Sequence, residues 1–324
     1  MVTIRIPLAE RRDASYDIVI GRGLLDGLTP VVRAACPASR YAVITDSHVS
    51  ALYGGRLVAR LCDASLPAEL FEFPAGEWNK TRESWAVLSD RLLARQFGRD
   101  AAVIALGGGV VGDVAGFVAA TYLRGIPYVQ VPTTLLAMID SSVGGKTGVD
   151  VPAGKNLLGA FHQPRLVIAD LDVLVSLPQQ QLAAGMAEAV KHGVIGDAAY
   201  FATLERDVDA IAARQPEALE RMVRRSVEIK ADVVAADERD AGQRAVLNFG
   251  HTVGHAIEAT ARFAALHGEA VAIGMAYEAR LAEVLGIAER GTTARLVGLL
   301  ERYRLPCALP DTATVDALIA AMQL

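Results

Sequence analysis

Hydrophobic and polar residues are distributed in two different ways along this chain. In the first half, short runs rich in β-branched and aromatic residues predict strands at residues 16–20, 41–45, 102–106 and 128–131. Helical patterns separate these runs, and residues 83–97 are one example. Strands that alternate with helices are typical of βαβ units. We therefore expect a Rossmann-like α/β first half with a mostly parallel sheet.

The pattern changes near residue 170, after which apolar residues recur with the 3.6-residue period of helices. The predicted helices cover residues 221–237, 254–261 and 270–285. The last of them is followed by Gly286, a typical helix stop. The sequence therefore predicts two domains: an α/β domain at residues 1–170 and an all-α domain at residues 171–324.

Composition excludes several classes of protein. The chain has 324 residues, of which 52% are hydrophobic and 21% charged, and these fractions exclude a disordered chain. The formal net charge of −5 argues against a nucleic-acid or anionic-membrane partner. The three cysteines lie far apart, and the most apolar stretch, residues 101–123, is interrupted by Asp113 and glycines. We expect a cytoplasmic globular protein that does not span a membrane.

Lysine is rare in this chain. Of the 32 basic residues only five are lysines, namely Lys80, Lys146, Lys155, Lys191 and Lys230. Because arginine supplies the ordinary surface cations, the lysines are candidates for places that need a compact ammonium with an adjustable pKa. Codon usage and chance are the alternative explanation.

A strand that runs into glycines and then into a helix is predicted at residues 102–113. Gly107, Gly109 and Gly112 fit the G-x-G-x-x-G spacing. Backbone amides at such a turn can approach a pyrophosphate, and the helix N-terminus adds partial positive charge. The alternative is a tight turn without a ligand.

A second glycine-rich loop follows this turn. Gly145, Lys146 and Thr147 resemble the end of a P-loop, but the full motif fails because residue 140 is Asp. Asp140, Asn156 and the lysines nearby predict a polar pocket for an anionic, hydroxylated ligand.

Histidines and a glutamate form a candidate metal site. His251 and His255 are four residues apart on one predicted helix, and His267 follows. Glu188 and His192 have the same spacing on another helix. Two histidines and a carboxylate leave coordination positions open, as a catalytic zinc requires. Spacing alone leaves three pairs possible: His251 with His255, His251 with His267, or Glu188 with His192.

Together these segments resemble the 3-dehydroquinate synthase family of sugar-phosphate cyclases, which acts in the shikimate pathway of aromatic amino-acid biosynthesis. The matching motifs lie at residues 74–80, 107–117, 132–137, 140–148, 154–156, 185–188, 247–258 and 267–271. All five lysines fall on family site positions. The resemblance extends over nearly the whole chain.

The resemblance implies a phosphate-eliminating carbon–oxygen lyase that converts 3-deoxy-D-arabino-heptulosonate 7-phosphate into 3-dehydroquinate and phosphate. In the family, NAD oxidises a ring alcohol, phosphate leaves by β-elimination, the hydride returns, and an intramolecular aldol step closes the new ring. The implied cofactors are NAD and Zn²⁺ or Co²⁺, and the implied partners are a small phosphorylated keto-acid and a second copy of the chain. The first domain would bind NAD, and the second would bind the metal and the substrate.

The resemblance also assigns residues. The family's metal ligands match Glu188, His251 and His267. Its NAD-site residues match Asp46, Glu77, Lys80, Gly108, Gly109, Val110, Gly112, Asp113, Thr133, Thr134, Lys146, Lys155 and Ser176. Its catalytic and substrate-contacting residues match Asp140, Lys146, Asn156, Lys191, Lys230, Arg244, Asn248, His255 and, reaching into the neighbouring subunit, Arg124.

Three features depart from the family pattern. Ser176 and Gln181 stand where the family usually has Thr and Glu, and the change at residue 181 removes a carboxylate near the cofactor region. The family continues beyond the position of Leu324 with a phosphate-contacting lysine. From this we expect a phosphate site held by Lys146, Lys191 or Asn156 and by Arg124 of a second copy of the chain, and less complete than in the family.

The sequence has three alternative functional interpretations. A cyclase acting on another sugar phosphate shares the metal and NAD motifs, but Arg244 and Asn248 fit the dehydroquinate pattern. A metal-dependent NAD alcohol dehydrogenase shares the fold, but the loops at residues 141–148 and 154–156 argue against it. A non-catalytic binding protein would be expected to lose metal ligands or lysines.

Overall fold

The computed structural model describes residues 13–260, 266–310 and 313–322. Six strands form its main sheet: β1 (Asp17–Gly21), β2 (Tyr41–Asp46), β3 (Ala68–Phe73), β4 (Ala102–Gly107), β5 (Tyr128–Pro132) and β8 (Leu166–Asp170). Their order is β1-β8-β5-β4-β2-β3, and every neighbouring pair is parallel. The predicted parallel sheet and its four predicted strands are confirmed, and β3 and β8 are additional.

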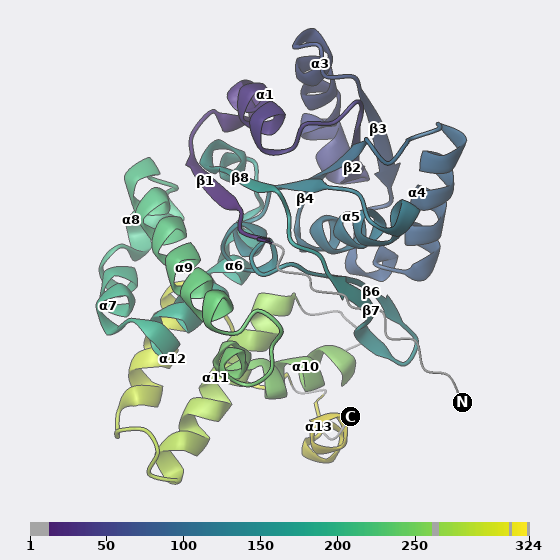
Figure 1. Ribbon diagram of the computed structural model, residues 1–324. Coiled ribbons are helices and arrows are strands. Elements are labelled where there is room, and N and C mark those ends of the chain that lie inside the picture. The colour runs from purple at the N-terminus through teal and green to yellow at the C-terminus, as the bar shows by residue number, and fades with distance from the viewer. Residues whose placement is uncertain (1–12, 261–265, 311–312, 323–324) are drawn as a thin grey trace, which may run out of the picture.

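Helices cover both faces of this sheet (Figure 1). They are α1 (Leu24–Ala35) and α3 (Gly55–Asp63) on one face, and α4 (Arg82–Ala94) and α5 (Gly109–Thr121) on the other. Successive side chains of a strand point to opposite faces of the sheet. Val43 accordingly packs under α1 and α3, and Ile44 packs under α4 and α5. A sheet buried on both sides explains why its strands are almost continuously apolar.

An antiparallel hairpin of β6 (Lys146–Val151) and β7 (Gly154–Phe161) precedes β8. It packs against α5, and Figure 1 shows it beside the helical part of the chain. The sequence predicted a loop here. The difference arises because Leu157 and Phe161 are 61% and 41% exposed, so the hairpin lacks the buried alternating face that marks a strand.

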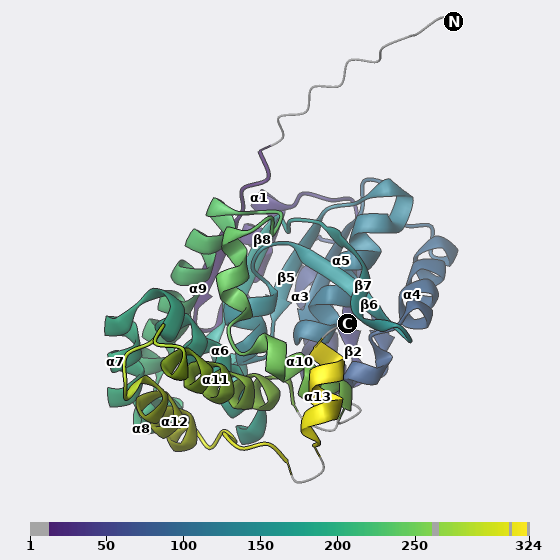
Figure 2. The same cartoon turned by 90° about the horizontal axis from the view of Figure 1, so that it is seen from below.

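Helices make up the described chain after Asp170, with no strand among those residues. The main ones are α6 (Gln179–Gly196), α7 (Ala198–Arg206), α8 (Val208–Ala212), α9 (Pro216–Ala236), α10 (His251–Thr260), α11 (His267–Val284), α12 (Thr292–Arg302) and α13 (Val315–Met322). Figure 2 shows them grouped beside the sheet with its covering helices. The expected all-α second half is confirmed, and the boundary near residue 170 stays a prediction.

The ends and packing of these helices follow from small residues. Gly286 has a φ of 71° and ends α11, with Ile287 N donating to Ala282 O at 2.8 Å in the expected helix-stop geometry. Residues 182–193 of α6 are all buried, because their alanines and glycines let α11 and residues 135–136 approach closely. A central helix of this kind places its polar side chains inside the molecule.

The apolar stretch at residues 101–123 forms β4, α5 and a short turn. None of the helices in the described ranges combines the length and apolar character that a membrane crossing requires. Residues 323–324 lie outside the described residues, and the expectation of a less complete phosphate site stays a prediction.

Candidate active site

A cavity of about 620 Å³ opens between the sheet with its hairpin and the helices α6, α9, α10 and α11. This volume lies within the usual range for sites that hold a small molecule or a cofactor. The predicted residues that line it are Glu77, Lys80, Gly109, Val110, Asp113, Asp140, Lys146, Lys155, Asn156, Lys191, Lys230, Arg244, Asn248, His251, His255 and His267. All five lysines of the chain therefore face one cavity.

Some predicted residues lie next to the cavity without lining it. Glu188 is directly behind it, in contact with Lys191. Gly108, Gly112, Thr133 and Thr134 lie at or just after the carboxyl ends of β4 and β5, where Thr133 N donates to Gly107 O at 2.9 Å.

Three other predicted residues do not line the cavity and lie elsewhere in the structure. Asp46 caps the short helix α2 (Ser47–Val49) by accepting from His48 N and Val49 N. The Ser176 hydroxyl bonds the Tyr53 hydroxyl at 2.7 Å. Arg124 is exposed in the turn η3 (Tyr122–Arg124).

Glu188 of α6 is the centre of the candidate metal site. Its Oε1 lies 3.6 Å from His251 Nε2 and 3.5 Å from His267 Nε2. The nearest Lys191 contact is on the other oxygen, Oε2. Oε1 is buried and makes no hydrogen bond among the described residues, whereas Oε2 is paired with the Lys191 ammonium. Three potential ligand atoms within 4.8 Å of one another, with a buried carboxylate oxygen that lacks a hydrogen bond, fit a divalent cation.

Charge at this centre favours a cation. Burial would raise the pKa of Glu188, but Lys191 and the two histidines lower it well below its usual value. Burial lowers the pKa of His251 to about 4, which leaves its ring neutral at pH 7. Burial also acts against a charged His267, yet its contacts with Glu188 and Glu258 raise its pKa to about 9. Zinc requires an ionised carboxylate and neutral imidazoles, so Glu188 and His251 already have the ligand form, whereas His267 must release a proton when the metal binds.

Two other groups of potential ligands occur among the described residues, and cations already hold part of each. Asp140, Glu188 and His192 form one group, in which Lys230 Nζ lies 2.5 Å from Asp140 Oδ1. His255, Glu258 and His267 form the other, in which Lys155 Nζ lies 2.9 Å from Glu258 Oε1. In the set of Glu188, His251 and His267 the lysine Lys191 contacts only Oε2, and both histidines face the other oxygen, Oε1, so this is the set that we favour among the pairs left open by spacing.

The glycine turn is the candidate dinucleotide site. In the strand order, chain connections leave in opposite directions from β2 and β4, and ligands of such sheets bind at this switch point beyond the carboxyl ends. There α5 begins at Gly109 without a side-chain cap. A Cβ on Gly108 would lie 3.1 Å from Thr134 Cγ2, a tight contact that glycine avoids. The backbone amides at the start of α5 can therefore face a phosphate directly.

Two lysines extend this dinucleotide site toward the hairpin. Lys80 Nζ lies 2.5 Å from Asp113 Oδ2 and donates to Asn156 Oδ1, while Lys155 Nζ lies 3.2 Å from Glu77 Oε1. Burial raises the pKa of Asp113, although Lys80 opposes this shift. These pairs hold their charged groups in place around an opening suited to an anionic cofactor.

Further cations line the cavity. Lys191 and Lys230 are almost completely buried, Arg244 Nη1 donates to Glu238 O at 2.9 Å, and Lys146 pairs with Asp240. Burial lowers the pKa of Lys230, and Asp140 acts against that shift. Ammonium and guanidinium groups at this density suit a ligand that carries phosphate and carboxylate groups.

Two charged residues that line the cavity, Asp240 and Glu258, were missed by the sequence analysis. Glu258 could have been found, because it follows His251 by seven residues and His255 by three on the same helix and so shares their face. Asp240 precedes the turn η6 (Gln243–Asn248), where no helical or strand period marks the direction of a side chain.

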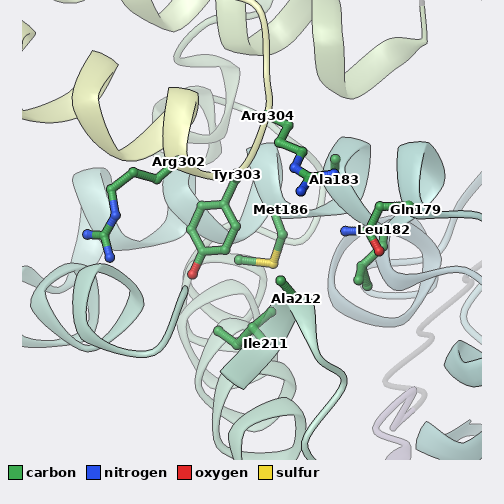
Figure 3. Close-up of a pocket in the computed structure, with 9 residues that line it drawn as sticks. All are labelled: Gln179, Leu182, Ala183, Met186, Ile211, Ala212, Arg302, Tyr303 and Arg304. Atoms are coloured by element: carbon green, nitrogen blue, oxygen red, sulfur yellow. The ribbon is translucent and has the colours of Figure 1, made fainter. Parts of the chain in front are cut away.

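A second hollow lies between α6, α8 and the end of α12 (Figure 3). Its volume is about 20 Å³, which is room for about one water molecule. Figure 3 shows Met186, Ile211 and Tyr303 around it, and the Tyr303 hydroxyl donates to Leu204 O at 2.8 Å. None of the predicted site residues lines this hollow, so it belongs to the packing of the helices.

His192 makes the stability of the metal-free chain depend on pH. Its ring is fully buried, both nitrogens lack a hydrogen-bond partner among the described residues, and burial followed by the charge of Lys191 lowers its pKa from 6.5 to about 4. The folded form keeps the ring neutral, whereas the unfolded chain binds a proton below pH 6.5. The contribution of His192 is therefore complete above pH 6.5 and is lost, by up to about 3 kcal/mol, as pH falls toward 4.

The measurement is the free energy of unfolding in urea from pH 7 to pH 5, with a chelator present. His192→Gln should flatten this pH dependence, whereas His48→Gln, at an exposed histidine, should leave it unchanged. Equal slopes for the wild type and His192→Gln would contradict the prediction.

Comparison with known proteins agrees with this geometry. The family described as 3-dehydroquinate synthase matches with its N-terminal part over residues 70–184 and with its C-terminal part over residues 185–324. A curated relative, 3-dehydroquinate synthase from Caulobacter vibrioides, is 52% identical over 98% of this chain and 87% of its own length.

Solved structures of related enzymes have the same fold. 2-Epi-5-epi-valiolone synthase from Streptomyces hygroscopicus is 33% identical, with a TM-score of 0.90 over 98% of this chain and 88% of its own. A structure of 2-deoxy-scyllo-inosose synthase is 28% identical, with a TM-score of 0.85 over 95% of this chain and 83% of its own. Fold and site thus define a sugar-phosphate cyclase. Within that class, the chain belongs to the 3-dehydroquinate synthase family.

Proposed function

We propose that this chain converts 3-deoxy-D-arabino-heptulosonate 7-phosphate into 3-dehydroquinate and phosphate. The observation that carries the proposal is one cavity in which a buried carboxylate with two histidines, five lysines and an uncapped glycine turn converge. Relatives about half identical over nearly the whole chain bear the name of this activity. A phosphorylated keto-acid carries the anionic groups that the lysines and Arg244 are suited to hold.

NAD and a divalent cation fit the groups present. The related valiolone synthase is described with NAD⁺ and Zn²⁺ bound, and the inosose synthase with NAD⁺ and Co²⁺. When bound, NAD supplies reversible hydride acceptance and the metal supplies polarisation of a substrate oxygen. Glu188, His251 and His267 would hold the metal, and the glycine turn with Lys80 and Lys155 would hold NAD.

The remaining side chains position the substrate and handle its protons. Lys146, Lys191, Lys230 and Arg244 would bind the phosphate and carboxylate, and Asp140, Asn156 and Asn248 would bind hydroxyls. The ring centroid of His255 is 5.2 Å from that of His251, and partial burial lowers its pKa below 6.5, so it can accept a proton at neutral pH. We assign His255 this role, outside the metal ligands.

A homodimer and the two-domain division belong to the same proposal. Leu123 and Arg124 have φ values of 48° and 72°, a left-handed conformation that costs energy for residues other than glycine. This turn presents Arg124 on the surface, away from its own cavity, and so suits a contact with the site of a second copy. Residues 1–170 would carry NAD, and residues 171–324 the metal and the substrate.

The test is phosphate release from the seven-carbon substrate by the purified chain, with and without added Zn²⁺ and NAD. Release should require both additions once the chain has been stripped of metal and nucleotide. A sugar 7-phosphate that lacks the carboxylate should release little phosphate, because it cannot use the Arg244 side of the cavity. Absence of release from the keto-acid, with metal and NAD bound, would contradict the proposal.

NAD should be recycled during this reaction. With NAD at the concentration of the enzyme and substrate in large excess, absorbance at 340 nm should rise by no more than one equivalent per site while phosphate release continues. Build-up of NADH in proportion to substrate would instead point to net hydride transfer, as in an alcohol dehydrogenase.

A further inference from the structure

Glu258 lies between the proposed cofactor and metal sites, and neither sequence pattern nor resemblance gave it a role. It belongs to α10, and its side chain is 3% exposed. Its Oε1 accepts a hydrogen bond from Lys155 Nζ at 2.9 Å and lies 3.4 Å from His267 Nδ1. One carboxylate oxygen therefore faces two partners that belong to different parts of the cavity.

Each partner leads to one of the two sites. Lys155 Nζ also lies 3.2 Å from Glu77 Oε1, on the side of the glycine turn. His267 uses its other nitrogen, Nε2, to face Glu188 Oε1 at 3.5 Å. Charged and polar contacts thus run without interruption from Glu77 through Lys155, Glu258 and His267 to Glu188.

We infer that Glu258 is a positioning residue that couples dinucleotide binding to metal binding. This inference rests on the proposed function. A metal-bound histidine ordinarily donates its second ring nitrogen to a carboxylate or carbonyl, which fixes the tautomer and makes the other nitrogen a better ligand. Glu258 is placed to accept from His267 Nδ1, so that the lone pair of Nε2 faces Glu188 and His251.

The direction of the coupling follows from the shared oxygen. Lys155 and His267 share Glu258 Oε1, so the Lys155 ammonium reduces the negative charge that this oxygen offers to His267 Nδ1–H. A dinucleotide phosphate that engages Lys155 Nζ weakens its bond to Glu258, which leaves that oxygen freer to accept from His267. NAD should therefore tighten metal binding, and by thermodynamic reciprocity the metal should tighten NAD binding by the same factor.

The experiment is calorimetric titration of Zn²⁺ into the metal-free chain, with and without saturating NAD. For the wild type, we expect metal affinity to rise about fivefold or more when NAD is present. Glu258→Gln should weaken metal binding about 10- to 100-fold and remove the effect of NAD. With Co²⁺ in place of Zn²⁺, the visible absorption of the bound metal should shift in this variant because His267 has become a weaker donor.

Two further variants make the test specific. Lys155→Met removes the cofactor-side partner, so metal affinity should stay at least as high as in the wild type. The effect of NAD should disappear in this variant even at NAD concentrations that a separate titration shows to saturate it. Lys155 is 22% exposed, so this variant decides the question if Glu258→Gln fails to fold. Glu205→Gln, which breaks a distant ion pair with Arg295, is the matched control and should retain the wild-type coupling.

The outcomes separate this inference from the proposed function. If the wild type releases phosphate and binds both cofactors, but Glu258→Gln or Lys155→Met keeps the full effect of NAD on metal affinity, the coupling is refuted and the proposed function stands. If the wild type binds neither Zn²⁺ nor NAD, the proposed function falls and the inference falls with it.

Discussion

Glu188→Gln is expected to empty the metal site and to lower kcat/KM for phosphate release about a thousandfold or more. Glu188 is the only anionic member of the favoured ligand set, and an amide cannot replace a carboxylate as a charged ligand for zinc. A metal that stabilises developing negative charge contributes several kcal/mol, and about 4 kcal/mol corresponds to roughly a thousandfold in rate. Elemental analysis of the purified variant and steady-state phosphate release measure the two effects.

A second consequence of this substitution is a loss of stability. Lys191 is 1% exposed and pairs with Glu188, so the variant leaves a buried ammonium with a neutral neighbour. Breaking one side of a buried ion pair costs about 3–5 kcal/mol. His251→Ala removes a proposed ligand without unpairing Lys191, so it tests the metal site separately. A folded Glu188→Gln or His251→Ala variant that retains one equivalent of tightly bound metal would contradict the assignment.

Local periodicity predicted the elements that are buried in a regular way. The strands β2, β4 and β5 are apolar runs between helices, and the structure has them within one or two residues of the predicted bounds. The hairpin of β6 and β7 was not predicted. A strand is distinguished by how its side chains pack against their neighbours, and Leu157 and Leu158 of β7 are exposed. Neither its composition nor its period separates it from a loop.

The sequence predicted which residues form the candidate site, but it did not predict how they are arranged in space. Spacing places His251 and His255 on one face of α10, but the side chain nearest to Glu188 on α11 is His267, which no local period connects with α6. The meeting of α6, α10 and α11 is decided by tertiary packing. The pairing of Asp240 with Lys146 and of Glu258 with Lys155 was unpredictable for the same reason. Both lysines belong to the hairpin, which is far from their partners in the sequence.

That tertiary packing depends on Gly268, and Gly268→Ala is expected to be strongly destabilising. A Cβ at this position would lie 1.9 Å from Ala184 O and 2.5 Å from Ala184 C, both backbone atoms of α6. Because a backbone carbonyl cannot rotate away like a side chain, α11 must move as a whole. Overpacking ordinarily costs about 1–3 kcal/mol, and we expect at least about 3 kcal/mol here. Urea unfolding at constant m measures this loss.

Gly298→Ala is the matched control, since this glycine lies inside α12 and a Cβ there would meet no atom within 4 Å. Alanine is the better helix former, so this variant should gain about 0.5–1 kcal/mol. Gly268 directly follows His267 in α11. A shift of α11 therefore moves a proposed metal ligand away from Glu188. Gly268→Ala should therefore bind metal more weakly even under conditions in which it is fully folded. A variant with wild-type stability and wild-type metal affinity would show that α6 and α11 can separate without cost, and that their close approach does not position His267.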